Sequence, residues 1–425
     1  MRAQAAALLL VAAAAASGAL DTSFGSGGKV GAPLASRQFA YALAIEPGGK
    51  LVVAGASSGA GSGVNLVRLG FGLWRYTAGG ALDTTFGPAH TGSVRTLLGP
   101  KGDEAHALAV QPDGKLVVAG STESTSTSAA IAVVRYSADG SLDTSFGPTH
   151  SGIVRTRVGA SAKALSLALQ PDGKIVAAGS VFNGSNTDFA LVRYTANGNL
   201  DPTFGTGGVV TTPVGTGADV AYAVAIQPDG KIVAAGLASD AARIGHAYDI
   251  ALVRYNSNGS LDTSFGSGGK VRTAIGSKDD VATALVIQPD GKLVVAGYAS
   301  GSVLVRYNPD GSLDAGFGSG GEVLPGALAG YRAAGLVLQP DGKLVTASYA
   351  PGPNSPKNRF AITRFLPNGS LDSGFGTGGT TITSNGGLAS QLGGLARQQD
   401  GKLVVTGTVV GNSKPEYLVL YRYLP

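Results

Sequence analysis

The chain of 425 residues is longer than one hydrophobic core usually supports, so we expect several domains or a repeat architecture. Its 67 glycines recur at regular places, and 44% of its residues are hydrophobic, which excludes a disordered low-complexity chain. The lack of cysteine excludes disulfides and thiolate chemistry. The formal net charge is +5, and the lysine and arginine residues are scattered along the chain rather than clustered, which disfavours a nucleic-acid surface.

The N-terminal segment differs in kind from the rest of the chain. Met1 and Arg2 form a short positive head, and an apolar run then ends at Ala16 before the small residues Ser17-Gly18-Ala19. The run is shorter than the roughly 20 residues that a membrane-spanning helix needs, and no second run of that length follows. We predict a cleaved secretory signal in residues 1–19 and a secreted or periplasmic protein.

A five-residue turn pattern then recurs seven times. In the copy Gln227-Pro228-Asp229-Gly230-Lys231, proline supplies a fixed φ and glycine takes a positive φ, as a tight turn requires. The copies begin at residues 46, 111, 170, 227, 288, 339 and 398; the first lacks the aspartate and the last lacks the proline. Because alternating apolar residues flank each copy, each one predicts a β-hairpin.

Each repeat predicts four antiparallel strands. In the fourth repeat these cover residues 219–226, 231–235, 250–255 and 261–271, with a variable loop after Gly236 and a glycine break in the last strand. In the first repeat, two similar segments at 66–68 and 73–76 leave the register of the third strand open. A four-stranded sheet must stack on neighbours to cover its faces, so we predict an all-β fold, a seven-bladed β-propeller that forms a single domain over residues 20–425.

The repeated motifs Leu-Asp-x-x-Phe-Gly, Gln-Pro-Asp-Gly-Lys and Val-Arg-Tyr together resemble the delta-60 repeat, a bacterial β-propeller domain of unknown function whose blade pattern is similar to that of NHL repeats. The resemblance covers residues 20–425, with local departures at Ala315-Gly316 and Ser373-Gly374. It implies a propeller fold and a secreted bacterial context. It brings no activity, ligand or catalytic residue with it.

An arginine lies eight residues before the aspartate of the Leu-Asp motif in six repeats, and this spacing places the two on adjacent strands. A charge pair that recurs in every blade is expected to be structural. The pairs are Arg75 and Asp83, Arg135 and Asp143, Arg193 and Asp201, Arg254 and Asp262, Arg306 and Asp314, and Arg364 and Asp372.

The variable loops point to a binding face. Loops after the second strand and after the fourth strand vary, and both sets emerge at the same end of an antiparallel blade. At this end, near the axis, we expect ligand-binding candidates that are acidic, namely Asp103, Glu104, Asp219, Asp279 and Asp280, and basic, namely Arg37, Lys163 and Arg332. We expect a ligand to contact these residues and the loops at 237–249 and 348–359.

No catalytic motif is present, and the four histidines, His90, His106, His150 and His246, are not spaced as a metal site. The first strands carry mainly Ala, Leu, Val and Ile, so polar ligands would come from the loops. We therefore expect a monomeric, non-catalytic module without a cofactor that binds a protein, peptide or polysaccharide. The alternative is a metal-assisted lyase or lactonase, in which the axial carboxylates bind calcium.

The two ends of the chain complete one another. The last residues, Tyr417 to Pro425, form a third strand with no Leu-Asp motif after it, whereas Leu20 and Asp21 begin such a motif with no third strand before it. We predict that residues 20–30 form the outermost strand of the seventh blade. In that arrangement Asp21 faces Arg422.

Overall fold

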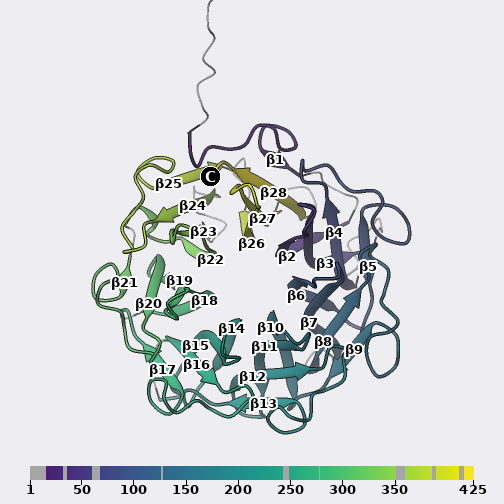
Figure 1. Ribbon diagram of the computed structural model, residues 1–425. Coiled ribbons are helices and arrows are strands. Elements are labelled where there is room, and N and C mark those ends of the chain that lie inside the picture. The colour runs from purple at the N-terminus through teal and green to yellow at the C-terminus, as the bar shows by residue number, and fades with distance from the viewer. Residues whose placement is uncertain are drawn as a thin grey trace, which may run out of the picture.

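The structure, a computed structural model, describes residues 16–31, 36–59, 68–125, 128–242, 248–276, 278–324, 326–350, 359–384, 389–410 and 416–425. Seven four-stranded antiparallel sheets are arranged around a central axis (Figure 1). The predicted seven-bladed propeller is confirmed. Most of the predicted signal segment, residues 1–15, and His246 lie outside the described residues.

Each blade runs from an inner first strand to a short outer fourth strand. Blades 1 to 4 contain β2 (Gln38–Ile45), β3 (Leu51–Ser58), β4 (Leu69–Tyr76) and β5 (Ser93–Thr96); β6 (Asp103–Val110), β7 (Leu116–Thr125), β8 (Ser128–Tyr136) and β9 (Ile153–Thr156); β10 (Ser161–Leu169), β11 (Ile175–Phe182), β12 (Thr187–Tyr194) and β13 (Val209–Thr212); and β14 (Asp219–Ile226), β15 (Ile232–Ala238), β16 (Asp249–Tyr255) and β17 (Lys270–Thr273). Blades 5 to 7 contain β18 (Asp280–Ile287), β19 (Leu293–Ala299), β20 (Ser302–Tyr307) and β21 (Glu322–Val323); β22 (Arg332–Leu338), β23 (Leu344–Tyr349), β24 (Arg359–Phe365) and β25 (Thr380–Ser384); and β26 (Ala389–Arg397), β27 (Leu403–Val410), β28 (Tyr417–Tyr423) and β1 (Lys29–Val30).

The fourth strand is shorter than its sequence pattern predicts. In blade 4 the first strand has the predicted bounds, but Leu261 makes only an isolated bridge to Tyr255, and the ordered fourth strand begins at Lys270. The Leu-Asp motif forms a turn instead, because the Asp262 carboxylate accepts hydrogen bonds from the backbone N–H and the hydroxyl of Ser264 at 3.2 and 2.7 Å. In blade 1, the third strand, β4, ends at Tyr76. It therefore uses the second of the two similar segments, residues 73–76, and not the first, residues 66–68.

The hydrophobic core is divided among the junctions between blades. Alternate residues of a strand face opposite sides of its sheet, so Val117 and Ala119 of β7 pack against blade 3, whereas Leu116 and Val118 pack against blade 1. The second strands are therefore buried on both faces, which accounts for their nearly continuous apolar sequence. Each blade therefore needs both neighbouring blades to bury the apolar residues of its two faces.

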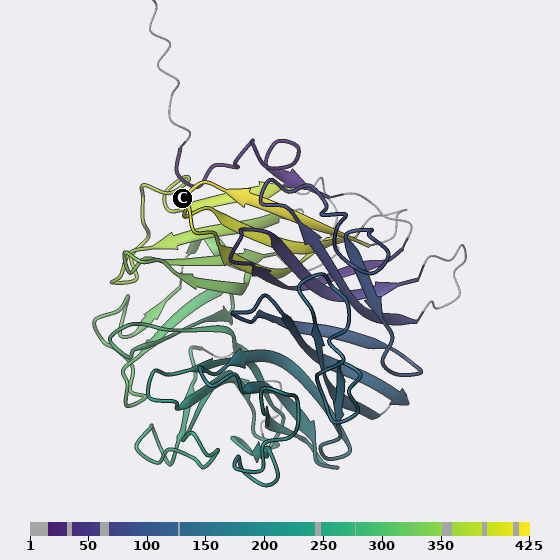
Figure 2. The ribbon, with the colours of Figure 1, turned by 45° about the vertical axis from the view of Figure 1, so that its right-hand side comes forward.

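The seventh blade is completed by the N-terminal strand, as predicted. Lys29 and Val30 of β1 pair with Tyr421 and Leu420 of β28, and Leu20 forms a bridge to Tyr423. Figure 2 shows the purple N-terminal segment beside the yellow C-terminal strands. The paired strand is shorter than the predicted 20–30, for the same reason as in the other blades: the Leu-Asp motif forms a turn.

The described residues contain one short 3-10 helix, Gly326–Leu328. In this part of the chain no helix has the length and apolar character needed to cross a membrane.

Candidate functional site

In every blade the arginine and aspartate of the repeat lie in contact. The distance between the arginine Nε or Nη and the aspartate Oδ2 is 2.7 to 2.9 Å in all seven, including Arg422 with Asp21. The lysine of the turn motif approaches the same carboxylate, as Lys231 does at 3.0 Å from Asp262. The role of this lysine was not predicted, although its recurrence in every turn was an available signal.

The arginine also joins neighbouring blades. Arg254 lies over the ring of Phe265, with 4.5 Å between the guanidinium carbon and the ring centroid, and its Nη1 donates to the carbonyl of Pro309 in blade 5. The same bond to the next blade occurs in six blades among the described residues, from Arg75, Arg135, Arg193, Arg254, Arg306 and Arg422. These repeated charges are thus engaged in holding the ring together.

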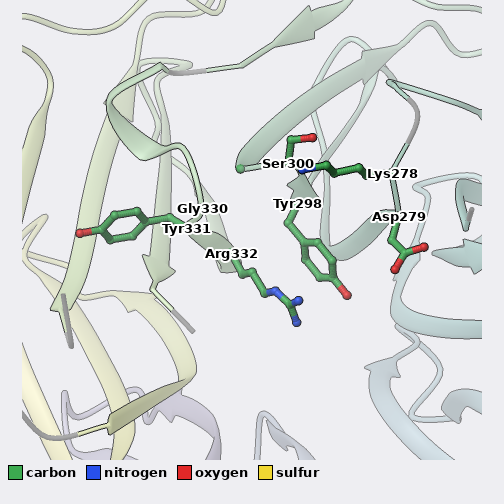
Figure 3. Close-up of a pocket in the computed structure, with 8 residues that line it drawn as sticks. Lys278, Asp279, Tyr298, Ser300, Gly330, Tyr331 and Arg332 are labelled. Atoms are coloured by element: carbon green, nitrogen blue, oxygen red, sulfur yellow. The ribbon is translucent and has the colours of Figure 1, made fainter. Parts of the chain in front are cut away.

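A pocket of about 230 Å³ opens between blades 5 and 6, at the end of the blades opposite the Arg–Asp pairs. Its lining comes from three connections: Lys278 and Asp279 lie between blades 4 and 5, Ser300 follows β19, and Arg332 begins β22 (Figure 3). Loops after a fourth strand and a loop after a second strand therefore meet here. This is the end at which the sequence analysis expected ligand binding, although the loops it named, 237–249 and 348–359, lie partly outside the described residues.

Two of the predicted candidates, Asp279 and Arg332, lie in this pocket around Tyr298. The Arg332 guanidinium carbon is 4.4 Å from the centroid of the Tyr298 ring. Figure 3 shows the Arg332 side chain directed toward Tyr298, while the Tyr331 ring points away. Burial raises the pKa of the Tyr298 hydroxyl, so this group is a neutral hydrogen-bond donor at physiological pH.

Lys278 and Arg332 are the two cations of the pocket. Neither Lys278 nor Arg332 lies within salt-bridge distance of a carboxylate in the described part of the chain. Asp279 accepts a hydrogen bond from the backbone N–H of Tyr248 at 3.3 Å. Within the described residues, the pocket thus offers two positive charges that form no ion pair, one carboxylate and the hydroxyl groups of Tyr298 and Ser300.

Three predicted acidic candidates lie elsewhere and are engaged with the backbone. Asp103, Asp219 and Asp280 begin the first strands of their blades and are at most 1% exposed. The Asp103 oxygens accept bonds from the backbone N–H groups of Leu98 and Gly99 at 2.7 and 2.8 Å, and Asp219 holds its preceding loop in the same way. Asp280 accepts a bond from the N–H of Ile275 through one oxygen, at 2.6 Å. Burial raises the pKa of Asp219 and of Asp280, against the effect of these N–H groups. These carboxylates secure the loops that precede their strands.

The remaining candidates are spread over other blades. Arg37 forms a two-pronged ion pair with Glu416, with N to O distances of 2.7 and 2.8 Å. Lys163 lies 3.8 Å from Glu123, and Glu104 lies 3.4 Å from a ring nitrogen of His106. The structure therefore does not bring the eight candidates together into one site.

Each first strand contains a bulge that the sequence pattern did not predict. The strand pairing skips one residue in every blade, and the skipped residues are Tyr41, His106, Leu165, Tyr222, Thr283, Ala334 and Gly393. The first strands thus carry aromatic and polar side chains beside the expected aliphatic ones, and the rings of Tyr41 and His106 lie 5.1 Å apart across two blades. A variable residue between two small ones, as in Ala-Tyr-Ala and Ala-His-Ala, was the available signal.

The acidic candidates differ in their surroundings. Among the described residues, no three His, Asp or Glu side chains gather as a metal site. Of the five acidic candidates, Asp103, Asp219 and Asp280 are buried and accept backbone hydrogen bonds, whereas Glu104 lies beside His106 and Asp279 lines the pocket.

Comparison with known proteins agrees with the fold. Six stretches of the chain, which together cover about half of it, match the family described as "Domain of unknown function (DUF5122) beta-propeller": residues 47–86, 111–146, 170–204, 227–265, 288–317 and 339–375. No curated protein matches the chain.

Solved structures are similar at low sequence identity. Sqt1 from Chaetomium thermophilum is 12% identical over 92% of this chain and 97% of that chain, with a TM-score of 0.46. A protein of unknown function from Dyadobacter fermentans is 10% identical over 94% and 100%, with a TM-score of 0.45, and the α-L-arabinofuranosidase Arb93A from Fusarium graminearum is 10% identical over 93% and 96%, with a TM-score of 0.43. On the family match, this chain belongs to the DUF5122 β-propeller family.

Proposed function

We propose that this protein is a secreted, non-catalytic binding module whose pocket between blades 5 and 6 takes an acidic sugar residue of an extracellular polysaccharide. The observation that carries the proposal is the pair of unpaired cations, Lys278 and Arg332, beside the half-buried Tyr298. A carboxylate on the ligand would pair with these cations. Its hydroxyl groups would match Asp279, Ser300 and the Tyr298 hydroxyl.

The size and setting of the pocket support the same reading. A volume of about 230 Å³ is below that of pockets that enclose drug-sized ligands, and it fits a single sugar unit of a longer chain. The pocket residues are carried by loops between strands of the closed ring, and a site that is organised before binding loses less entropy on binding. The metal-assisted alternative is not favoured, because three of its carboxylates, Asp103, Asp219 and Asp280, are buried and accept backbone hydrogen bonds, which leaves Asp279 as the one acidic group among the described residues of the pocket.

The test is a binding comparison between acidic and neutral polymers. Purified protein is titrated with polygalacturonic acid and with dextran, and affinity is measured by calorimetry. We expect binding to the acidic polymer alone, weakening as salt rises because the charges are partly exposed. The variants Arg332→Ala and Lys278→Ala should each weaken it by about tenfold or more.

Lys101→Ala is the matched control. Lys101 precedes Asp103 by two residues, as Lys278 precedes Asp280. The substitution Lys101→Ala therefore removes the same charge from the equivalent loop of another blade. Its affinity should equal that of the unchanged protein. If all three variants weakened binding equally, the loss would reflect the change in net charge and not the pocket. Undiminished binding by Arg332→Ala would refute this pocket as the site.

A further inference from the structure

A recurring turn connects the third strand of a blade to its Leu-Asp motif. In blade 6 it comprises residues 366–370: the backbone N–H of Leu366 donates to the carbonyl of Ser370 at 2.8 Å, and that of Gly369 donates to Leu366 at 2.9 Å. The Asn368 carbonyl accepts a bond from Gly318 of blade 5 at 2.8 Å. Gly369 has a φ of 89°, which favours glycine.

Blade 7 builds the same turn from the two ends of the chain. The backbone N–H of Leu424 donates to the carbonyl of Ala19 at 2.8 Å, and that of Gly18 donates to Leu424 at 3.0 Å. The Ser17 carbonyl accepts a bond from Gly376 of blade 6 at 2.9 Å, and the Ser17 hydroxyl contacts the Pro425 carbonyl. Ser17, Gly18 and Ala19 thus occupy the places of Asn368, Gly369 and Ser370.

The glycine in this segment is required by the fold. Gly18 has a φ of 84°, and a Cβ atom there would lie 2.9 Å from the backbone nitrogen of Gly376. A leader peptide that is discarded has no use for a residue matched to this turn. The three residues therefore serve the folded ring.

We propose that the leader is removed between Ala16 and Ser17, so that the mature protein begins with the turn residues. The proposal rests on the predicted leader and moves its end from residue 19 to residue 16. Ala14 and Ala16 supply the small residues three places and one place before the cut that a signal peptidase recognises. Water hydrolyses the peptide bond, its hydroxyl passing to the Ala16 carbonyl carbon and a proton to the Ser17 amine.

The mature N-terminus can be measured directly. The full chain is expressed in a bacterial host with a general secretory pathway, and the exported protein is identified by intact mass and N-terminal sequencing. We expect it to begin at Ser17. A protein that begins at Leu20, or one that keeps its leader, would overturn the proposal.

A pair of substitutions separates the two cleavage sites without depending on folding. Ala16→Leu places a large residue immediately before the proposed cut and should cause unprocessed precursor to accumulate on a gel. Ala19→Leu should leave processing unchanged. The reverse pattern would show that the peptidase cuts after Ala19.

Stability gives a second readout. The mature chain that begins at Ser17 should melt more than about 2 °C above the chain that begins at Leu20, because the shorter chain lacks the three backbone bonds of the turn. Identical melting temperatures would contradict a role for these residues in the mature protein.

Discussion

The aspartate of each Leu-Asp motif carries more of the fold than a single ion pair does. In blade 4, one Asp262 oxygen faces Arg254 and Lys231, while the other accepts two hydrogen bonds from Ser264. A buried ion pair stabilises a protein only when its remaining hydrogen-bonding capacity is satisfied, and here it is. Arg254 adds its contact with Phe265 and its bond to the next blade.

Arg254→Ala should lower the free energy of unfolding by about 3 kcal/mol or more, since it leaves a buried carboxylate with Lys231 as its only cation. Urea denaturation followed by fluorescence measures the loss. Lys278→Ala, which removes an unpaired surface cation, should change stability by less than about 0.5 kcal/mol. A similarly small effect of Arg254→Ala would contradict the structural role of the arginine.

Stability should fall in acid through the same carboxylates. Burial alone would raise the pKa of Asp21, but hydrogen bonds from Ser23 and the charges of Lys402 and Arg422 overcome it and lower this pKa from 3.8 to about 2. The pKa of Asp143 is also lowered to about 2. Because the folded pKa lies below the unfolded one, the contribution is fully present above the unfolded value and is lost as the pH falls through the folded value.

We therefore expect a melting temperature that is level down to about pH 5 and that drops steeply between about pH 4 and pH 2. Thermal scans followed by circular dichroism over this range provide the measurement. Asp143→Asn should be less stable at neutral pH and should show a shallower drop. Asp219 has the opposite effect on stability. Its folded pKa is raised above the usual 3.8, so its buried charge lowers stability at higher pH, and protonation in acid removes that effect. A melting temperature that rises toward pH 2 would contradict the prediction.

For single residues, the sequence predicted the Arg–Asp ion pairs better than it predicted the burial and the contacts of other side chains. The spacing of eight residues between Arg254 and Asp262 indicated adjacent strands, because strand geometry converts spacing into position. It could not indicate that Asp219 is buried under its own loop, since that depends on where loop N–H groups point in three dimensions. Arg332 was placed correctly at the loop end, but its stacking on Tyr298 joins two blades and has no signature in either repeat.

Among the elements, the first strand departs most from an ideal strand. The bulge at Tyr222 brings the carbonyl of Val220 close to Gly236 on β15, where an added Cβ atom would lie 1.9 Å from this oxygen. The period-2 pattern of the sequence predicted the bounds of β14 correctly. It did not predict the bulge. The skipped residue shifts the phase of the alternation, so that Ala221 shares a face with Val224 whereas Ala223 lies on the other face. Because both faces of this strand carry apolar residues, the shift leaves no mark in the hydrophobic pattern.

Gly236→Ala should therefore destabilise the protein by about 1–3 kcal/mol, as overpacking of a closed interior does. The unfolding midpoint in urea is the readout. Gly276→Ala in the neighbouring loop is the control, because a Cβ atom there meets nothing within 4 Å and the backbone φ is not positive. Equal stability of the two variants would mean that the bulge relaxes freely.

The closing strand provides a second test. Deletion of the N-terminal residues through Val30 removes the partner of β28 and also Phe24, which is buried between blades 7 and 1. The exposed edge of β28 should promote aggregation and lower the melting temperature. Light scattering during a thermal scan measures both effects, and Asp21→Asn shows how much the ion pair alone contributes. A truncated chain that stays clear and melts like the intact one would contradict this account of closure.

At the scale of the whole molecule, the sequence predicted the ring almost completely. Seven turn copies gave the number of blades, and the complementary motifs at the two ends gave the closure, because a repeat fold uses the same local rules seven times. The loop face follows other rules. The pocket between blades 5 and 6 depends on three connections that differ from their counterparts in the other blades, so no repeat pattern predicts its shape.

The turn that Leu424 shares with Gly18 has a consequence for how freely this chain could be rearranged. In a chain that begins at Ser17, as proposed above, a peptide bond from Pro425 to Ser17 would complete a turn like that at residues 366–370, and opening the chain between Pro367 and Asn368 would place an equivalent break in blade 6. Such a circular permutant would form the same interblade bonds in a different order. Which blade is assembled from both ends of the chain is then interchangeable among the seven, and the ring itself has neither a first blade nor a last.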